Sequence, residues 1–284
     1  MSSPYHSGER QLQRAAGLDG EAAHVAQIIQ PRLSSTGAKL FLSLVETIVV
    51  AGLDDRRRCW VTACTGRPGF VRTTSDQLHI VGGLRDVDSL AALGPGDPVG
   101  TLAIDMARRR RFRVNGTIQS SDCDGITIAV REAYANCPKY IDTTTRIEPL
   151  PPPEQVTSYR QSVLTVSDVS LLDACRTFFI GSVHPNRGAD ASHRGGEPGF
   201  VQTDNNSQLR FSDYAGNAMF NTLGNLSLNP TVGLLFIGPG GDRLQITGTA
   251  TIHFHEPSAK SPEGRTILVQ IDESQRWTLV AVMK

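Results

Sequence analysis

The chain has 284 residues, of which 39% are hydrophobic and 20% are charged, and its 28 basic residues balance 28 acidic ones. This composition excludes a disordered chain and a mini-protein, and the length suits either one large barrel or two compact domains. A net charge of zero argues against a general attraction to nucleic acid or to a membrane surface.

Cysteine usage and the chain's beginning point to a compartment. The five cysteines are odd in number and lack a paired zinc spacing, which predicts reduced thiols. The N-terminal residues lack the apolar core of a signal peptide, and the longest apolar runs, such as 48–53 and 232–237, are too short to span a bilayer. We therefore expect a soluble, cytoplasmic protein.

The first 45 residues contain helical patterns. Ala22, Val25 and Ile29 fall on one face after Asp19, and a second helix is predicted around 39–45. From Thr47 onward, β-branched runs separated by Gly, Pro and Asp predict six or seven strands. These runs are 47–54, 59–65, 69–74, 77–81, 98–105, 111–118 and 125–132.

A proline-rich segment follows at 146–156, with Pro149 and three consecutive prolines at 151–153. Such a stiff, extended segment is typical of a connection between domains. We place domains at residues 1–148 and 157–284. After the connection a helix is predicted at 169–176, and β-branched runs resume. These runs are 177–184, 199–204, 208–213, 231–238, 243–254, 265–272 and 277–283.

The two halves repeat each other in order. Residues 67–71 match 197–201, and 47–53 match 177–183, both at an offset of 130. Val99 then matches Val232 at an offset of 133, and Asn115-Gly116-Thr117 matches Thr247-Gly248-Thr249 at an offset of 132. Matches at nearly constant spacing predict an internal duplication of a small β-barrel domain.

The densest group of polar and glycine residues lies in the second half. Residues 190–201 read DASHRGGEPGFV and residues 209–217 read LRFSDYAGN; LGN, NP and VGLLF follow in order. This series resembles the flavin-nucleotide-binding family related to pyridoxamine 5'-phosphate oxidase. The first half resembles a companion domain of that family through residues 66–70, 108–116 and 136–141.

The resemblance covers nearly the whole chain and implies both fold and cofactor. Members of the family share a split β-barrel and bind FMN at a dimer interface. The implied fold is mainly β with a few short helices, in two tandem split β-barrel domains that form an intramolecular pseudo-dimer. The implied cofactor is FMN, held mainly by the second half.

The residues themselves support a phosphate-bearing ligand. Ser192 and Arg194 lie two apart on a predicted strand and therefore on one face, where they offer charge-assisted donors. Residues 212–217 end a strand and begin a helix-like stretch, so their N–H groups offer an anion site. Alone, the glycines favour ordinary turns over a site, and a lone arginine is usually a solvated surface group; the resemblance reverses that preference. It implies FMN contacts from Ser192, His193, Arg194, Gly196, Asp213, Gly216 and Asn217.

The first half lacks the same elements, since residues 61–66 read VTACTG and no Gly-Asn pair follows. Its arginine run at 108–113 predicts either a solvated strand edge or a contribution to the second-half site from across the interface. We expect Arg110 or a neighbour to make that contribution. We therefore expect each chain to bind one FMN.

Two other groups of residues carry side chains that could react or bind a metal. Cys137, two residues before Lys139, is either a reactive thiol near a cation or a buried packing cysteine. His253 and His255 share a strand face, but two ligands are a weak case for a metal, and no metal site is predicted.

The favoured function is that of an FMN-dependent oxidoreductase acting on an unidentified small molecule, with no catalytic residue assigned. No dinucleotide fingerprint follows a strand, so a nicotinamide or deazaflavin donor would visit as a soluble substrate. The alternatives are a non-catalytic flavin carrier or sensor, and a haem-binding split barrel that uses His193, His253 and His255. We expect a monomeric pseudo-dimer or a homodimer, without nucleic-acid or membrane partners.

Overall fold

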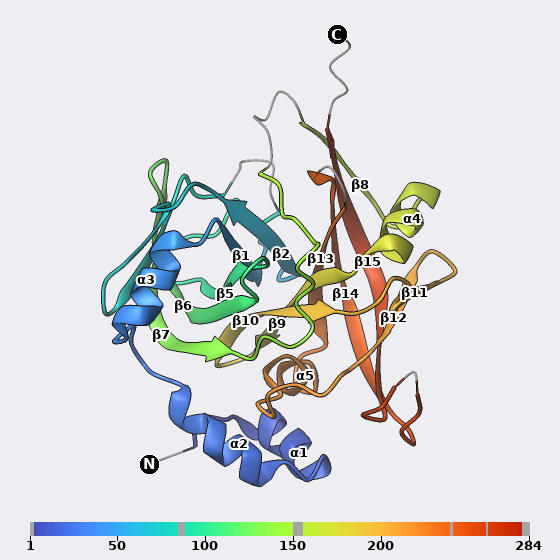
Figure 1. The fold of residues 1–284 in the computed structure, drawn as a ribbon. Coiled ribbons are helices and arrows are strands. Elements are labelled where there is room, and N and C mark those ends of the chain that lie inside the picture. The colour runs from blue at the N-terminus through green and yellow to red at the C-terminus, as the bar shows by residue number, and fades with distance from the viewer. Residues whose placement is uncertain (1–2, 85–88, 150–155, 239–240, 260, 280–284) are drawn as a thin grey trace.

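The computed structural model describes residues 3–84, 89–149, 156–238, 241–259 and 261–279 (Figure 1). The three consecutive prolines of the predicted domain connection, residues 151–153, lie outside the described residues.

Helices open the chain. They are α1 (Ser7–Ala15), α2 (Asp19–Val25), a 3₁₀ turn at Ala26–Ile28 and α3 (Thr36–Leu44). Helix α1, which the sequence did not predict, begins with a capping box: the His6 side chain accepts from the Glu9 N–H, and the Glu9 carboxylate accepts from the His6 N–H. Its buried face is largely polar, with Glu9 and Gln13 beside Leu12, so no apolar stripe marks it in the sequence.

The first half forms a seven-stranded antiparallel sheet in the order β2-β1-β5-β6-β7-β4-β3. Its strands are β1 (Thr47–Leu53), β2 (Cys59–Thr65), β3 (Val71–Thr73), β4 (Gln77–Val81), β5 (Pro98–Asp105), β6 (Arg110–Asp122) and β7 (Gly125–Asn136). Trp60, Leu78 and Val114 belong to the apolar core that this sheet encloses with α3.

The second half repeats the order as β10-β9-β13-β14-β15-β12-β11, with β8 added beside β15. Its elements are β8 (Val156–Gln161), α4 (Val166–Ala174), β9 (Thr177–His184), β10 (Gly188–Gly195), β11 (Val201–Asp204), β12 (Gln208–Ser212), α5 (Asn221–Leu226), β13 (Thr231–Ile237), β14 (Arg243–Phe254) and β15 (Arg265–Leu279). The identical strand order confirms the predicted duplication and the mainly β fold. The two runs expected at 265–272 and 277–283 are a single strand as far as Leu279.

Matching glycines show why parts of the repeat are visible in the sequence. Gly116 and Gly248 both stand at a β-bulge, where a Cβ atom would lie 2.0 and 2.1 Å from a backbone carbonyl oxygen of the neighbouring strand. No other residue fits there without moving the strand. The same backbone constraint therefore acts in both halves.

The halves pack against each other through equivalent contacts. Gly100 of β5 lies so close to β10 that a Cβ atom would be 2.5 Å from the Asp190 Cα, and Gly233 of β13 approaches the Trp60 Cα in the same way, at 2.9 Å. A shared apolar cluster joins Val49 and Leu102 to Phe179 and other second-half residues. The two barrels thus form an intramolecular pseudo-dimer.

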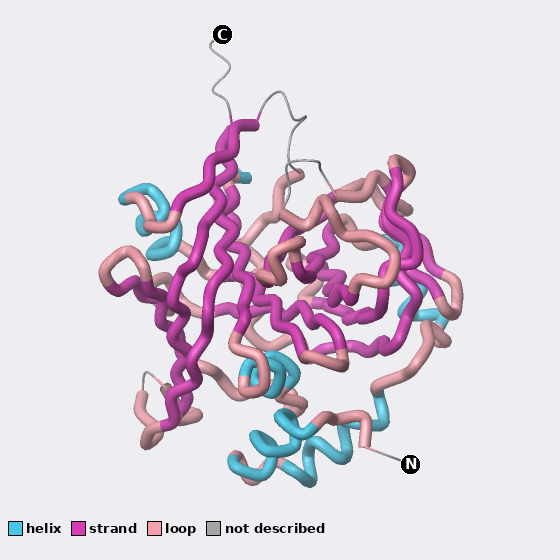
Figure 2. The backbone as a smooth tube through the Cα atoms, turned by 180° about the vertical axis from the view of Figure 1, so that it is seen from behind, coloured by secondary structure: helices cyan, strands magenta, loops and turns pink. Residues whose placement is uncertain are grey.

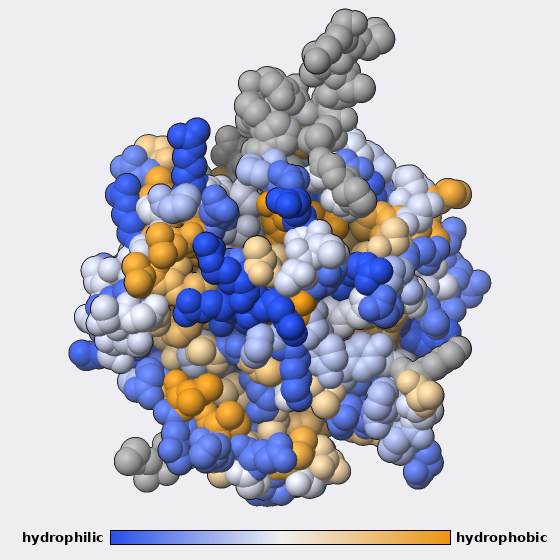
Figure 3. Space-filling view, in the orientation of Figure 1, coloured by the Kyte–Doolittle hydropathy of each residue, from blue (hydrophilic) through white to orange (hydrophobic). Residues whose placement is uncertain are grey.

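The first two helices pack beside the sheets, where Tyr5 and Ala22 join Tyr134 of β7 in an apolar cluster. Figures 1 and 2 show α1 and α2 at one end of the molecule, beside α5. On the face shown in Figure 3, hydrophobic groups gather in several separate areas around a hydrophilic centre. In the described part of the chain, no helix is long and apolar enough to cross a membrane. None of the five cysteines, which all lie within the described residues, forms a disulfide.

Candidate functional site

A cavity of about 310 Å³ opens between the two halves. The second half contributes the end of β10 and the segment 213–223, and the first half contributes β6 and the segment 136–140. Leu18 and Glu21, at the start of helix α2, add part of the wall. Its volume lies at the lower end of the range of about 300–1,000 Å³ for small-molecule sites.

Strand alternation decides which arginines of the 108–113 run reach this cavity. Arg111 and Arg113 line it, whereas Arg110 points to the other face of β6, with its guanidinium 5.0 Å from the centre of the Phe41 ring. Of the expected contribution from Arg110 or a neighbour, the structure thus places Arg110 outside the cavity and its neighbour Arg111 in the lining.

Arg113 is a buried anchor. Its Nε lies 2.9 Å from Asp190 Oδ1, and its Nη1 donates to the Tyr134 hydroxyl at 2.9 Å and to Asn221 Oδ1 at 3.0 Å. The third nitrogen, Nη2, donates to the Ala191 carbonyl and to Ser192 Oγ. Burial lowers the pKa of this guanidinium, but Asp190 and Tyr134 more than offset that effect and the pKa is raised. With all three nitrogens engaged, Arg113 holds the cavity wall rather than a ligand.

Burial and the contact with Arg111 together determine the protonation of His193. Arg111 Nη1 lies 3.0 Å from His193 Nδ1, and because a guanidinium only donates, Nδ1 must be the accepting nitrogen. The other nitrogen, Nε2, lies 3.4 Å from Thr177 Oγ1. Burial, with the charges of Arg111 and Arg194, lowers the pKa of His193, so the ring is neutral. Burial lowers the pKa of Arg111 to about 10, with help from Arg113 and Arg194, which leaves it charged at pH 7.

Arg194 is only weakly neutralised by the acidic groups of the cavity. Its nearest acidic contact, Asp213 Oδ1, lies 3.9 Å from Nη2, while Asp213 Oδ2 lies 3.0 Å from Arg265 Nε. The Arg194 Nε is buried and has no hydrogen-bond partner among the described residues. A buried donor without a partner is costly, so this guanidinium is suited to an anionic ligand.

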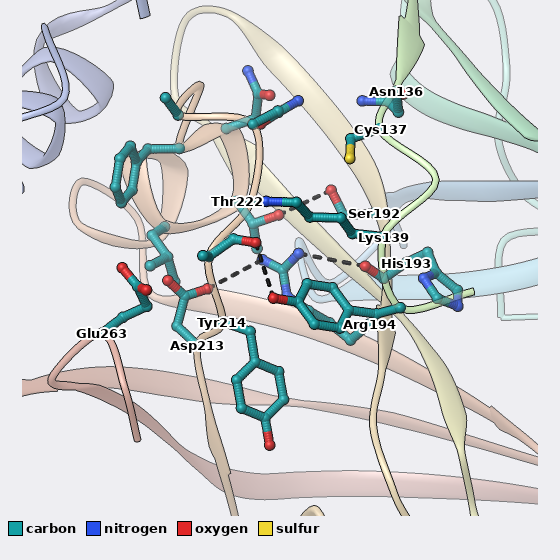
Figure 4. Close-up of a pocket in the computed structure, with 18 of the residues that line it drawn as sticks. Asn136, Cys137, Lys139, Ser192, His193, Arg194, Asp213, Tyr214, Thr222 and Glu263 are labelled. Atoms are coloured by element: carbon teal, nitrogen blue, oxygen red, sulfur yellow. Dashed lines mark hydrogen bonds and ion pairs between the residues drawn. The ribbon is translucent and has the colours of Figure 1, made fainter. Parts of the chain in front are cut away.

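Other polar groups face the same space. Figure 4 shows Lys139, Ser192, Arg194 and Thr222 converging on the cavity. The Ser192 hydroxyl donates to Asp190 at 3.0 Å and accepts from Thr222 at 3.0 Å, so its hydrogen is already engaged. Lys139 is exposed and enters from the first half. Asn136 Oδ1 is buried without a partner among the described residues and offers an acceptor.

Two tyrosines, one from each half, form an aromatic wall. The rings of Tyr140 and Tyr214 lie 5.5 Å apart between centroids, and the Tyr140 hydroxyl donates to the Ala215 carbonyl at 3.1 Å. Gly195 permits this approach, because a Cβ atom there would be 2.0 Å from the Tyr140 carbonyl oxygen. Such a wall suits a planar ring.

The predicted loop reaches the cavity, but not as the start of a helix. Gly216 and Asn217 line the cavity with Asp213, and helix α5 begins only at Asn221 and has six residues. The N–H groups of residues 214–217 therefore belong to a loop, because Ala218 and Phe220 adopt left-handed backbone angles that prevent an earlier helix.

Gly196, expected at the cofactor, lies outside the cavity lining. Its N–H donates to the Arg176 carbonyl, and a Cβ atom would meet the ring of Phe200. Gly66 makes the equivalent turn in the first half, with its N–H on Glu46 and the ring of Phe70 beside it. A turn that both halves share serves the fold rather than the ligand.

The three histidines of the haem alternative do not come together at the cavity. His193 lines it with both nitrogens near partners, whereas His253 and His255 are exposed at the end of β14 and beyond it. The His255 nitrogens lie 2.8 Å from the Glu256 carbonyl and 2.9 Å from Thr266 Oγ1. The geometry therefore does not support the haem hypothesis.

Sequence reasoning did not assign Lys139, Tyr140 or Thr222 to the site and covered Arg111 only as a neighbour of Arg110, yet all four line it. The resembling segment 136–141 was the signal for Lys139 and Tyr140. Strand alternation through 108–113 left the choice between Arg110 and Arg111 open, since the face directed to the cavity depends on pairing with a neighbouring strand.

The second half is similar to a known family. Residues 168–274 match the family model "Pyridoxamine 5'-phosphate oxidase". Similar solved structures include the HupZ protein of Group A Streptococcus, with 10% identity over 39% of this chain and 98% of that chain and a TM-score of 0.32. An F420 reductase has 18% identity over 37% and 93% of the chains, with a TM-score of 0.29. A putative pyridoxamine 5'-phosphate oxidase from Listeria innocua has 16% identity over 37% and 90%, with a TM-score of 0.28.

No curated protein matches the chain. The family match contains β10, segment 213–223 and the residues at 263–265, which are all the second-half parts that line the cavity. Through residues 168–274, the chain is thus related to the pyridoxamine 5'-phosphate oxidase family.

Proposed function

We propose that the chain binds FMN in the cavity between its halves and acts as a flavin-dependent oxidoreductase on a small molecule. The observation that carries the proposal is Arg194, a cation whose Nε has no partner in the described structure and whose acidic neighbour Asp213 lies closer to Arg265. The family match to residues 168–274 supports a flavin-binding protein of this type.

The donor set fits FMN in three respects. A phosphate accepts hydrogen bonds and carries negative charge, which suits Arg194 together with Lys139 from the other half. The Tyr140 and Tyr214 rings offer a flat surface to an aromatic ring system. The partnerless Asn136 Oδ1 would accept from a ring N–H.

A bound FMN would supply one-electron or hydride transfer, for which the protein provides orientation and electrostatics. In this cavity Arg111 and neutral His193 form a rigid pair behind the ligand, and Arg113 keeps the walls of both halves together. A reduced nicotinamide or deazaflavin would deliver electrons as a soluble substrate. The small-molecule substrate would then react with the flavin in the same cavity.

Titration with FMN tests the binding site. Arg194→Ala should weaken FMN binding by about 2 kcal/mol, or roughly 30-fold in Kd, because a charge-assisted contact to phosphate is lost. Quenching of flavin fluorescence measures the Kd. Arg210→Ala is the matched control, since Arg210 is an exposed arginine of β12 that contacts Gln202. An unchanged Kd in folded Arg194→Ala would remove Arg194 from the phosphate site.

A second experiment separates an enzyme from a carrier. Bound FMN is reduced by a reduced nicotinamide or by a reduced deazaflavin, and its absorbance is followed after addition of candidate oxidants. Reoxidation that saturates with one small molecule supports an oxidoreductase. Reoxidation at the rate of free flavin with every compound supports a carrier or sensor.

A further inference from the structure

Helix α1 and its N-cap residue contact loop 213–222, called the ligand loop because it lines part of the cavity, and helix α5 after it. Gln13 Nε2 donates to the Met219 carbonyl at 3.1 Å, and Asn221 Nδ2 donates to Glu9 Oε1 at 2.7 Å. His6 Nε2 lies 3.0 Å from Asn225 Oδ1. These contacts connect α1 and its N-cap residue to the loop before α5 and to α5 itself.

Helix α1 also touches α5 backbone to backbone. A Cβ atom at Gly8 would lie 2.3 Å from the Gly224 carbonyl oxygen, and one at Gly224 would lie 2.6 Å from Glu9 Cγ. Two glycines facing each other allow this approach, and any side chain at either position would separate the helices. The contact is therefore specific to this docked arrangement.

The loop that α1 contacts is strained. Ala218 and Phe220, on either side of Met219, have φ angles of 61° and 59°, a conformation unfavourable for residues with a Cβ atom. Ala218 and Met219 are buried against Tyr5 and Ala22, which come from the N-terminal segment. Strain of this kind persists only where surrounding contacts impose it.

The same loop forms part of the cavity wall. Gly216, Asn217 and Thr222 line it, and Asn221 Oδ1 accepts from Arg113, the anchor between the halves. From Glu9, a chain of hydrogen bonds runs through Asn221 to Arg113 and Asp190. The position of α1 is thus linked to the shape of the site.

We propose that residues 3–28 form a cap that holds loop 213–222 in its ligand-binding conformation, with Gly8 and Glu9 as positioning residues. The proposal rests on the proposed flavin site for its ligand, but the coupling between cap and loop is a property of the protein alone. Leu18 and Glu21 of the cap also line the cavity, so the docked cap completes one wall.

A matched pair of glycine variants tests the cap in the full chain. Gly8→Ala and Gly20→Ala each replace a helical glycine with the best helix former, but a Cβ atom at Gly20 meets nothing within 4 Å. Gly8→Ala should increase amide hydrogen exchange in residues 213–222 and weaken FMN binding about tenfold, as expected if the competent loop falls to roughly a tenth of the population. Gly20→Ala should change neither.

A second pair tests Glu9. Glu9→Ala should reproduce both effects, whereas Glu9→Gln keeps an oxygen for Asn221 and should restore most of the FMN affinity. A merely structural role would lower the urea midpoint without a matching change of loop exchange or Kd.

Loop exchange without ligand distinguishes the two proposals. If exchange in 213–222 is the same in Gly8→Ala as in Gly20→Ala, the cap proposal is overturned, whatever the protein binds. If loop exchange responds as expected but the unaltered protein binds no FMN, the cap stands and the proposed function fails.

Discussion

The duplication relates the cavity to a second position on the other side of the pseudo-dimer, and the two positions have diverged in chemistry. Strand register identifies the equivalent residues. Leu102 pairs with Arg113 across β5 and β6, and Leu235 pairs with Gln245 across β13 and β14. Arg113 donates to the Ala191 carbonyl, and Gln245 donates to the equivalent carbonyl of Val61 at 2.8 Å. At the second position, Gln245 therefore takes the place that Arg113 takes at the cavity.

At the second position, packing fills the place of the cavity. Trp277 pairs with Arg243 as Asn136 pairs with Arg111, so its indole takes the place of the amide that lines the cavity. The Trp277 side chain is 2% exposed, and its Nε1 donates to Gln245 Oε1 at 2.7 Å. A large buried ring with a satisfied N–H contributes to the core.

The ionic groups have changed in parallel. At the offset of 130 residues, Trp60 corresponds to Asp190 and Cys64 to Arg194. The buried ion pair of Arg113 and Asp190 thus has a neutral counterpart. Since a buried ion pair stabilises a fold no better than well-packed apolar groups do, its presence on one side indicates a role beyond stability.

The largest expected difference between the two positions is in flavin content. We expect one FMN per chain, because the second position lacks an equivalent of Arg194 and Trp277 occupies the place of Asn136. Flavin released by denaturation is quantified against protein concentration after saturation with FMN. Two FMN per chain would show that the second position still binds, and the comparison would then fail.

A substitution that makes one position like the other sharpens the comparison. Arg113→Gln, the residue of the second position, should reduce the free energy of unfolding by about 3–5 kcal/mol, because Asp190 is left as a buried, unpaired charge. Urea denaturation measures the change. Arg110→Gln on the same strand removes an arginine that lies over Phe41 and should cost about 1 kcal/mol or less.

The double variant Arg113→Gln with Asp190→Asn completes that test. It should recover part of the loss, since the unpaired charge is removed with its partner. Equal costs for Arg113→Gln and Arg110→Gln would contradict the assignment of Arg113 as the anchor.

The sequence predicted what repeats and missed what depends on register. The strands follow from β-branched runs that both halves share, and Gly116 with Gly248 marks the bulges because no other residue fits there. The choice of Arg111 over Arg110 depends on which face of β6 meets the other half, and sequence alternation alone does not settle it. Trp277 corresponds to Asn136 only through pairing between strands.

Helix α1 was missed for a different reason. Its buried face carries Glu9 and Gln13, which bond to the ligand loop, so burial there follows from tertiary hydrogen bonds rather than from apolar periodicity. A polar face that packs against another element carries no signal in a single sequence. The part of the site that depends on α1 was therefore outside the prediction.

The smallest expected effect is a pH dependence of the unfolding free energy that arises from two groups of the N-terminal segment. Burial raises the pKa of Glu9 to about 7 and lowers the pKa of His6 to about 4. The Glu9 side chain faces His6, Asn221, Glu132 and Asp190, and the His6 side chain faces His184, Asn225, Arg10 and Arg187. Glu9 and His6 both belong to the cap, and Glu9 Oε2 lies 3.4 Å from His6 Nε2, so their contributions act on the same contact.

The two shifts have opposite signs. Between pH 4.5 and 7, folded Glu9 keeps a proton that the unfolded chain has released, so its contribution to stability is present at low pH and is lost as pH rises through about 7. Between pH 4 and 6.5, unfolded His6 takes up a proton that the folded state does not bind, so its contribution is present above pH 6.5 and is lost as pH falls toward 4. Each slope is about 1.4 kcal/mol per pH unit, and they cancel between pH 5 and 6.5.

We therefore expect the unfolding free energy of the unaltered protein to vary by no more than about 1 kcal/mol between pH 5 and 6.5 as far as this pair is concerned. Glu9→Gln should leave the His6 term alone, so that stability falls by about 2 kcal/mol on acidification over this range. His6→Asn retains a good N-cap residue and should give the opposite slope, since only the Glu9 term remains. Urea denaturation at pH 5, 5.75 and 6.5 measures all three proteins, and parallel pH profiles for the two variants would show that the buried pair does not titrate as its environment predicts.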